Sequence, residues 1–165
     1  MRALANTLQQ FGRLQTPNDA RATFREALGL YDELLRVQAN EPGVWNECSS
    51  TWLGLVHSLA GQEREEAVAE AERHAGRAEE LKRGAGAYNL ACAAALAGKK
   101  DEAFRLLEAA LPATGETRSH IEADPDLDSL KNDPRWRPLL DKHRPITDTR
   151  DGRWGPGADA ENRAT

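Results

Sequence analysis

A run of small apolar residues between Leu90 and Gly98, LACAAALAG, limits the folds open to this chain. Alanine favours helices and has little side-chain volume, so the run predicts a helix that cannot fill a core by itself. Small side chains instead let a second helix approach closely. We therefore expect a helix crossing at short distance, and we expect Gly98 to end the first helix in the left-handed conformation.

The rest of the chain also has the periodicity of helices. Thr16 and Pro17 resemble a helix start, and apolar residues then recur at steps of three and four as far as Leu35. A further helix begins at Glu41-Pro42, carries apolar residues as far as Leu59, and is expected to stop at Gly61. No segment alternates apolar and polar residues as a strand does. The sequence predicts an all-α protein.

These helices are predicted to form pairs, because short turn signals separate consecutive apolar stripes. The pairs are expected at about 2–40, 42–83 and 85–111. In the middle pair the second helix has a narrow stripe of alanine, and its remaining residues are mostly charged. Such a helix is expected to bury one face and expose the other.

The segment 87–111 resembles a tetratricopeptide repeat, a helix-turn-helix unit with small residues where its helices cross. The residues at the family's spacings are Leu90, Ala91, Ala94, Gly98, Ala103, Leu107 and Ala110. The two earlier pairs match less fully. The resemblance implies a short right-handed α-solenoid of about three antiparallel pairs, with Ala91 at the crossing and Ala93 on the outer side. An irregular helical bundle with one repeat is the alternative.

Residues 115–143 are predicted to close this stack with capping helices. An EF-hand loop counted from Asp124 would need glycine and glutamate where Ser129 and Arg135 stand, so calcium binding is not expected. Asp126 is instead predicted to start a short helical turn, and apolar residues after it would cover the exposed end of the last pair. The segment resembles the one that closes bacterial tetratricopeptide arrays.

The chain is expected to form one helical domain over 1–144, followed by a disordered tail over 145–165 that could carry a binding motif around Trp154. The net charge of −5 disfavours nucleic acid and anionic membrane as main partners. No uncharged run reaches the ~20 apolar residues of a membrane helix, and no signal-peptide core is present. We expect a cytoplasmic protein.

Catalytic and metal-binding motifs are missing from the sequence. The stretch Gly84–Gly86 lacks the third glycine of a dinucleotide fingerprint, and no nucleophile elbow, P-loop or zincin motif occurs. Cys48 and Cys92 stand alone in apolar contexts, which is typical of buried free thiols. We expect no enzyme activity, no cofactor and no metal.

The histidines are the remaining residues that could support catalysis. His57 lies in an apolar segment and is expected to be a packing residue, whereas His74 is expected to face solvent. His120 stands near the acids of the closing segment and is expected to be solvated. A helical enzyme that uses His57 or His120 is the weakest of the three functional hypotheses.

The resemblance instead implies a binding module, because first helices of tetratricopeptide stacks line a concave groove for a peptide or a partner helix. Carried over position by position, it implies groove residues Arg2, Asn6, Gln9, Thr51, Trp52, Leu55, Tyr88, Asn89 and Cys92. Trp52 and Cys92 fit the core equally well. Most basic positions of the family's carboxylate clamp are occupied here by uncharged residues.

We therefore expect a protein–protein interaction module whose groove chemistry rests on amides and aromatic side chains. Its partner is an unidentified protein or peptide. The alternative is a structural role, as a self-associating homo-oligomer or as a subunit of a larger complex.

Overall fold

The computed structural model describes residues 1–114 and 117–142, and these residues form helices and no strands, which confirms the all-α prediction. Three consecutive helix pairs come first: α1 (Arg2–Arg13) with α2 (Pro17–Val37), α3 (Pro42–Val56) with α4 (Gly61–Leu81), and α5 (Ala87–Leu96) with α6 (Lys100–Thr114). A closing segment follows, made of α7 (Arg118–Ala123), the 3-10 helix η1 (Pro125–Leu130) and α8 (Trp136–Lys142). The predicted tail, with Trp154, lies outside the described residues.

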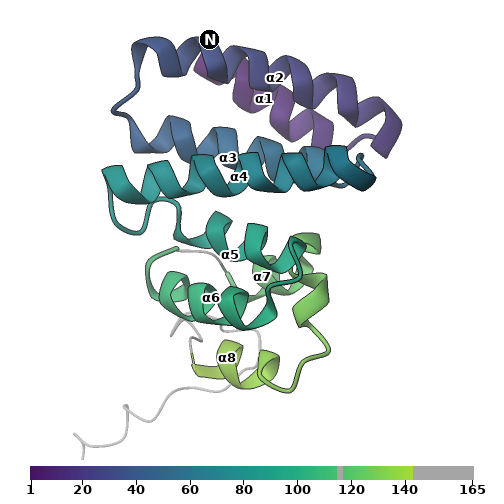
Figure 1. The fold of residues 1–165 in the computed structure, drawn as a ribbon, viewed down its shortest axis with the longest axis vertical. Coiled ribbons are helices and arrows are strands. Elements are labelled where there is room, and N and C mark those ends of the chain that lie inside the picture. The colour runs from purple at the N-terminus through teal and green to yellow at the C-terminus, as the bar shows by residue number, and fades with distance from the viewer. Residues whose placement is uncertain (115–116, 143–165) are drawn as a thin grey trace, which may run out of the picture.

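Each pair packs on the next one in the chain. Helix α2 lies on α3, and α4 lies on α5, so the three pairs follow one another along the long axis of the molecule (Figure 1). Helices α3 and α5 also touch each other, and η1 packs on α5. In the part of the chain that is described, no helix is long and apolar enough to cross a membrane.

Proline and glycine mark several of the helix boundaries. Pro17 and Pro42 stand at the first positions of α2 and α3, where the missing N–H would have no partner in the helix. Helix α3 ends at Val56, so Leu59, which was predicted to lie in it, belongs to the connection that follows. Gly61 does not stop α3 but begins α4, with a φ of 54°.

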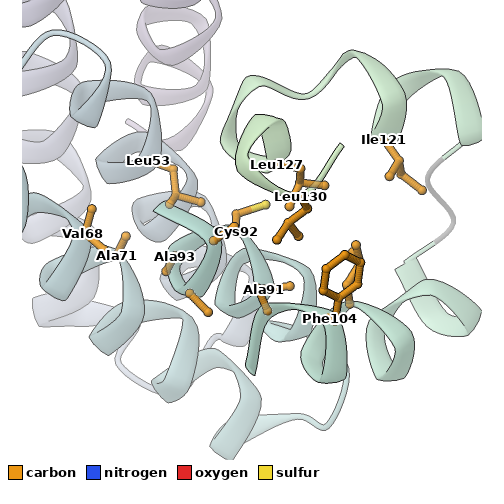
Figure 2. Close-up of a cluster of buried hydrophobic side chains, with 14 of the residues drawn as sticks. Leu53, Val68, Ala71, Ala91, Cys92, Ala93, Phe104, Ile121, Leu127 and Leu130 are labelled. Atoms are coloured by element: carbon orange, nitrogen blue, oxygen red, sulfur yellow. The ribbon is translucent and has the colours of Figure 1, made fainter. Parts of the chain in front are cut away.

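Helix α5 is enclosed on all sides, which explains why its residues are small. All five residues from Ala91 to Ala95 are at most 3% exposed. Side chains of α3 and α4 cover one side of α5, and Leu127 and Leu130 of η1 cover another (Figure 2). The prediction that Ala93 lies on the outer side is wrong, because the preceding helix pair packs there (Figure 2).

The buried apolar residues form two clusters that meet in α3. The first joins α1, α2 and α3, and the second runs from α3 through α8. Trp52 packs against both clusters, so it helps to join them. Leu127, Leu130 and Trp136 are buried in the second cluster, and the closing segment therefore shares a core with the last helix pair.

Gly98→Val is expected to lower the free energy of unfolding by about 1–2 kcal/mol, because Gly98 has a φ of 76°, where side chains with a Cβ are strained. A Cβ at this position would meet no atom within 4 Å, so the cost would be conformational alone. Urea unfolding followed by circular dichroism measures it. Gly29→Val, in open space within α2, is the control and should not destabilise the protein. Equal midpoints for the two variants would contradict the left-handed assignment.

Candidate functional site

A polar pocket of about 240 Å³ lies where the first helices of the pairs meet the closing segment. Helix α3 contributes Asn46, Ser50 and Leu53, which are spaced at four and three residues and therefore lie on one face of the helix. Arg13, at the end of α1, donates from Nη2 to Ser50 Oγ over 2.9 Å. One wall of the pocket is thus formed jointly by α1 and α3.

The beginning of α5 forms the adjoining wall. Tyr88, Asn89 and Cys92 all line the pocket. Asn89 Nδ2 donates to the carbonyl oxygen of Asn46 over 3.0 Å and to Asn46 Oδ1 over 2.9 Å. These two hydrogen bonds fasten α5 to α3 at the pocket.

The connection between α4 and α5 lines the pocket with Gly84 and Ala85. The Glu79 carboxylate accepts hydrogen bonds from the backbone N–H of Gly84, at 2.8 and 2.9 Å, and of Gly86, at 3.1 Å. Gly84 has a φ of 87°, which glycine adopts without strain. Glu79, one of the charged residues of α4, therefore holds this loop in shape.

The remaining wall is acidic and comes from the closing segment. Asp124 Oδ1 accepts from the backbone N–H of Asp126 over 3.0 Å and so caps η1, while Asp124 Oδ2 accepts from the Tyr88 hydroxyl over 2.8 Å. Asp126 was predicted to be the cap of this turn. Its Oδ1 instead contacts Nε2 of His57 at 2.6 Å, which ties the end of α3 to η1.

The structure revises two of the histidine predictions. His57 stands just after α3, partly exposed, and its pKa is raised chiefly by the hydrogen bond with Asp126. His74 is not solvent-facing but 2% exposed, with Nδ1 donating to the Glu70 carbonyl oxygen over 2.7 Å. Its ring centroid lies 5.4 Å from that of Trp45, and burial lowers its pKa. His74 is therefore a core residue and His57 a surface contact.

The contact between His57 and Asp126 is expected to make stability depend on pH. Since the pKa of folded His57 lies above the ordinary value of 6.5, its contribution to the unfolding free energy is complete below about pH 6.5. This contribution is lost as the pH rises through the raised pKa. Urea unfolding of the wild type and of His57→Gln should show a difference that shrinks from pH 6 towards pH 9. A difference in unfolding free energy that stays constant with pH would contradict the pairing. His74 has the opposite pH dependence, but it is present in both proteins, so its effect cancels in the difference.

Cys92 does not have the surroundings of a catalytic nucleophile. Burial raises the pKa of its thiol well above the ordinary value, and the charges of Asp126 and Asp124 act in the same direction. Its Sγ lies 3.9 Å from Asp124 Oδ2. A cysteine nucleophile needs a stabilised thiolate, usually beside a cation or a general base. Here Cys92 stands beside carboxylates, so the arrangement favours the neutral thiol.

The same three residues could supply ligands to a metal ion, since one atom of each of Cys92, Asp124 and Asp126 lies within 4.8 Å of the others. Zinc uses thiolate and carboxylate ligands, generally four in a tetrahedron. Both oxygens of Asp124 and one of Asp126 already accept hydrogen bonds or contact His57. The cluster is thus largely satisfied by protein groups.

Three of the nine predicted groove residues, Tyr88, Asn89 and Cys92, line this pocket. Trp52 and Leu55 instead border a different hollow, of about 520 Å³, which residues of α2, α3 and α4 surround. The residue of α3 that meets Asn89 at the pocket is Asn46.

The other four predicted groove residues lie in the contact of α1 with α2 and α3. Arg2 forms an ion pair with Glu47 at 2.9 Å, and Asn6 accepts a hydrogen bond from the Tyr31 hydroxyl. Gln9 and Thr51 are buried. Arg2 and Asn6 thus join α1 to its neighbours, and the Thr51 hydroxyl donates to the Glu47 carbonyl oxygen within α3.

Sequence reasoning missed Asn46, Ser50 and the acidic wall as parts of one site. The spacing of Asn46, Ser50 and Leu53 on one helix face was a usable signal. Asp124 is 36 residues from Tyr88, so the sequence alone does not show that the two side chains meet. It suggests only a calcium ligand or a solvated acid at this position. His120 of α7 also lines the pocket.

Comparisons with protein-family models, curated proteins and solved structures give no match to this chain. The tetratricopeptide resemblance of residues 87–111 therefore stays a prediction. What the molecule offers toward a function is the geometry of its pocket.

Proposed function

We propose that this chain is a tetratricopeptide-like protein that binds a segment of a partner protein in the polar pocket, without catalysis. The proposal rests on which helices line the pocket. Residues of α3 and α5 form two of its walls, and these are the first helices of successive pairs. In helical-repeat stacks the equivalent helices form the concave, ligand-binding side. The stacking of pair on pair along one axis supports the same architecture.

The chemistry of the walls suits a peptide. Asn46 and Asn89 supply side-chain amides, Ser50 a hydroxyl, and the loop at Gly84 supplies backbone groups. Such groups form hydrogen bonds with the backbone of an extended chain, which needs both donors and acceptors. Tyr88 is partly buried at the same place and offers an aromatic surface for a side chain of the partner.

Tyr88→Ala is expected to weaken partner binding about 30-fold, which corresponds to ~2 kcal/mol for the loss of a central aromatic contact. The partner would be captured by affinity pull-down with the full chain, and calorimetry with the purified partner would measure the dissociation constant. Glu65→Ala, on the exposed side of α4, is the control and should leave affinity unchanged. If Glu65→Ala weakened the binding of the partner and Tyr88→Ala left it unchanged, binding in the pocket would be contradicted.

Asn89→Ala is a poorer probe of binding. Asn89 holds α5 to α3 through two hydrogen bonds, so its replacement would change stability together with the shape of the pocket. Tyr88→Phe is the better companion, because it removes the hydroxyl bonded to Asp124 and keeps the ring.

Self-association through α1 is the second candidate function. Leu4 and Phe11 are 52% and 54% exposed, and their spacing of seven residues puts them on one side of α1; Leu14, directly after the helix, is 85% exposed. Exposed apolar patches often mark interfaces between proteins. Light scattering of the full chain and of Phe11→Glu distinguishes the candidates: a wild-type dimer that the substitution dissociates supports self-association, and a wild-type monomer contradicts it.

A further inference from the structure

The acidic wall of the pocket consists of two carboxylates, those of Asp124 and Asp126. Among the described residues, no arginine or lysine forms an ion pair with Asp124 or Asp126, and the imidazole of His57 contacts Asp126. Asp126 is buried and Asp124 is partly buried. The Asp126 N–H, the Tyr88 hydroxyl and His57 satisfy part of this wall, but none of these groups brings a permanent positive charge. The charge of this wall therefore favours a cationic ligand.

A further hydrogen-bond acceptor belongs to Asn89, which lines the same pocket. Asn89 is 8% exposed, and both of its hydrogen bonds use Nδ2, so Oδ1 accepts none from the described residues. Asp126 also has one oxygen, Oδ2, that takes part in none of the contacts found in the described chain. A ligand that brings N–H donors would satisfy these acceptors.

Arg13 is the one permanent cation among the pocket-lining residues of the described chain. Its guanidinium donates to the hydroxyl and the carbonyl oxygen of Ser50, so it is engaged on α3. The pocket, at about 240 Å³, is smaller than the ~300–1,000 Å³ typical of drug-sized ligands. Its size suits a single side chain.

We propose that the pocket receives one basic side chain of the partner segment, arginine in preference to lysine, whose N–H groups donate to Asp124, Asp126 and Asn89 Oδ1. The planar guanidinium has five donors, which matches several acceptors spread around one cavity. The source of the side chain rests on the proposed function above, whereas the preference for a cation follows from the acidic wall itself.

The first experiment uses two small probes with the full chain. N-acetyl-arginine amide carries the guanidinium, and N-acetyl-citrulline amide has nearly the same shape without the charge. We expect the arginine probe to shift the backbone resonances of Tyr88 and Asn89 in a saturable nuclear magnetic resonance titration. The citrulline probe should bind about tenfold more weakly, because charge-assisted hydrogen bonds are lost. Equal binding of the two probes would overturn the proposal.

Charge substitutions provide the second experiment. Asp124→Asn keeps an oxygen that can cap η1 and removes the charge, and it should weaken the arginine probe about tenfold. Asp128→Asn, on the same short helix but paired with Lys131 outside the pocket, is the matched control and should have no effect. Arg13→Gln should strengthen binding severalfold by removing a like charge. Weaker binding of the arginine probe by the Arg13 variant would mean that Arg13 supports the probe instead of repelling it, and would overturn the proposal.

Three further outcomes separate this proposal from its alternatives. If zinc ions bind with one equivalent, lose affinity on Asp124→Asn, and the arginine probe does not bind, the cluster is a metal site and the proposal is wrong. If Tyr88→Ala weakens the partner but Asp124→Asn does not, the basic side chain is excluded while binding in the pocket stands. Binding of the arginine probe with no effect of Tyr88→Ala on the partner would support the cationic site and contradict the proposed function.

Discussion

Gly86→Ala is expected to lower the free energy of unfolding by about 3 kcal/mol, because the added methyl group would overlap the backbone of another helix. A Cβ at Gly86 would lie 1.9 Å from the carbonyl oxygen of Ala75 and 2.8 Å from its carbonyl carbon. These are backbone atoms of α4, so no side chain can rotate away. The start of α5 would have to move away from α4, and the pocket loop would move with it.

The matched control for this substitution is Gly76→Ala, one residue beyond Ala75 in the same helix. A Cβ there meets no atom within 4 Å, and alanine is the better helix former, so stability should rise by about 0.5–1 kcal/mol. Urea unfolding followed by circular dichroism measures both variants. Similar midpoints for the two would contradict the close contact between α4 and the start of α5.

Ending the chain after Ala123 is expected to cause aggregation, because η1 and α8 would be lost together. Leu127 and Leu130 are fully buried, and Trp136 is nearly so. Without them the inner sides of α5 and α6 would face water. Deleting one buried leucine side chain typically costs about 2–5 kcal/mol, and this truncation deletes several large ones.

A chain that ends after residue 144 is the control for the truncation. It keeps every described helix and lacks only the predicted tail, so its melting temperature should equal that of the full chain. Thermal unfolding and light scattering of the two truncated chains provide the comparison. If both melted like the full chain, the closing segment would contribute no stability.

The closing segment also links stability to the proposed function. Asp124 and Asp126 belong to it, and they form the acidic wall of the pocket. The contact of Asp126 with His57 and the hydrogen bond of Asp124 with Tyr88 join this wall to α3 and α5. A change that loosens the closing segment should therefore weaken binding together with stability.

Much of the fold could be predicted from local signals in the sequence. Pro17 and Pro42 begin helices where the sequence places them, and Gly98 has the positive φ that its place after an alanine run predicts. Apolar periodicity predicts helices correctly because it depends only on neighbours three and four residues away. The all-α class follows from such signals alone.

The side of each helix that would be covered was harder to predict. Ala93 and His74 were both placed outside, and both are buried. Helix α5 has small apolar residues all round, so its sequence does not distinguish its inner side from its outer side. A polar residue such as His74 can be buried when its Nδ1–H finds a carbonyl oxygen and its ring finds Trp45.

The sequence by itself determined that this chain forms helices, where several of them begin and end, and that α5 would be closely packed. Only the tertiary structure decided where the pocket lies, since its parts come from distant segments. Tyr88 meets Asp124 across 36 residues, and His57 meets Asp126 across 69. Helix periodicity shows that a helix has an apolar face, but it does not show which other element covers that face. Which element covers it depends on the packing of the whole chain.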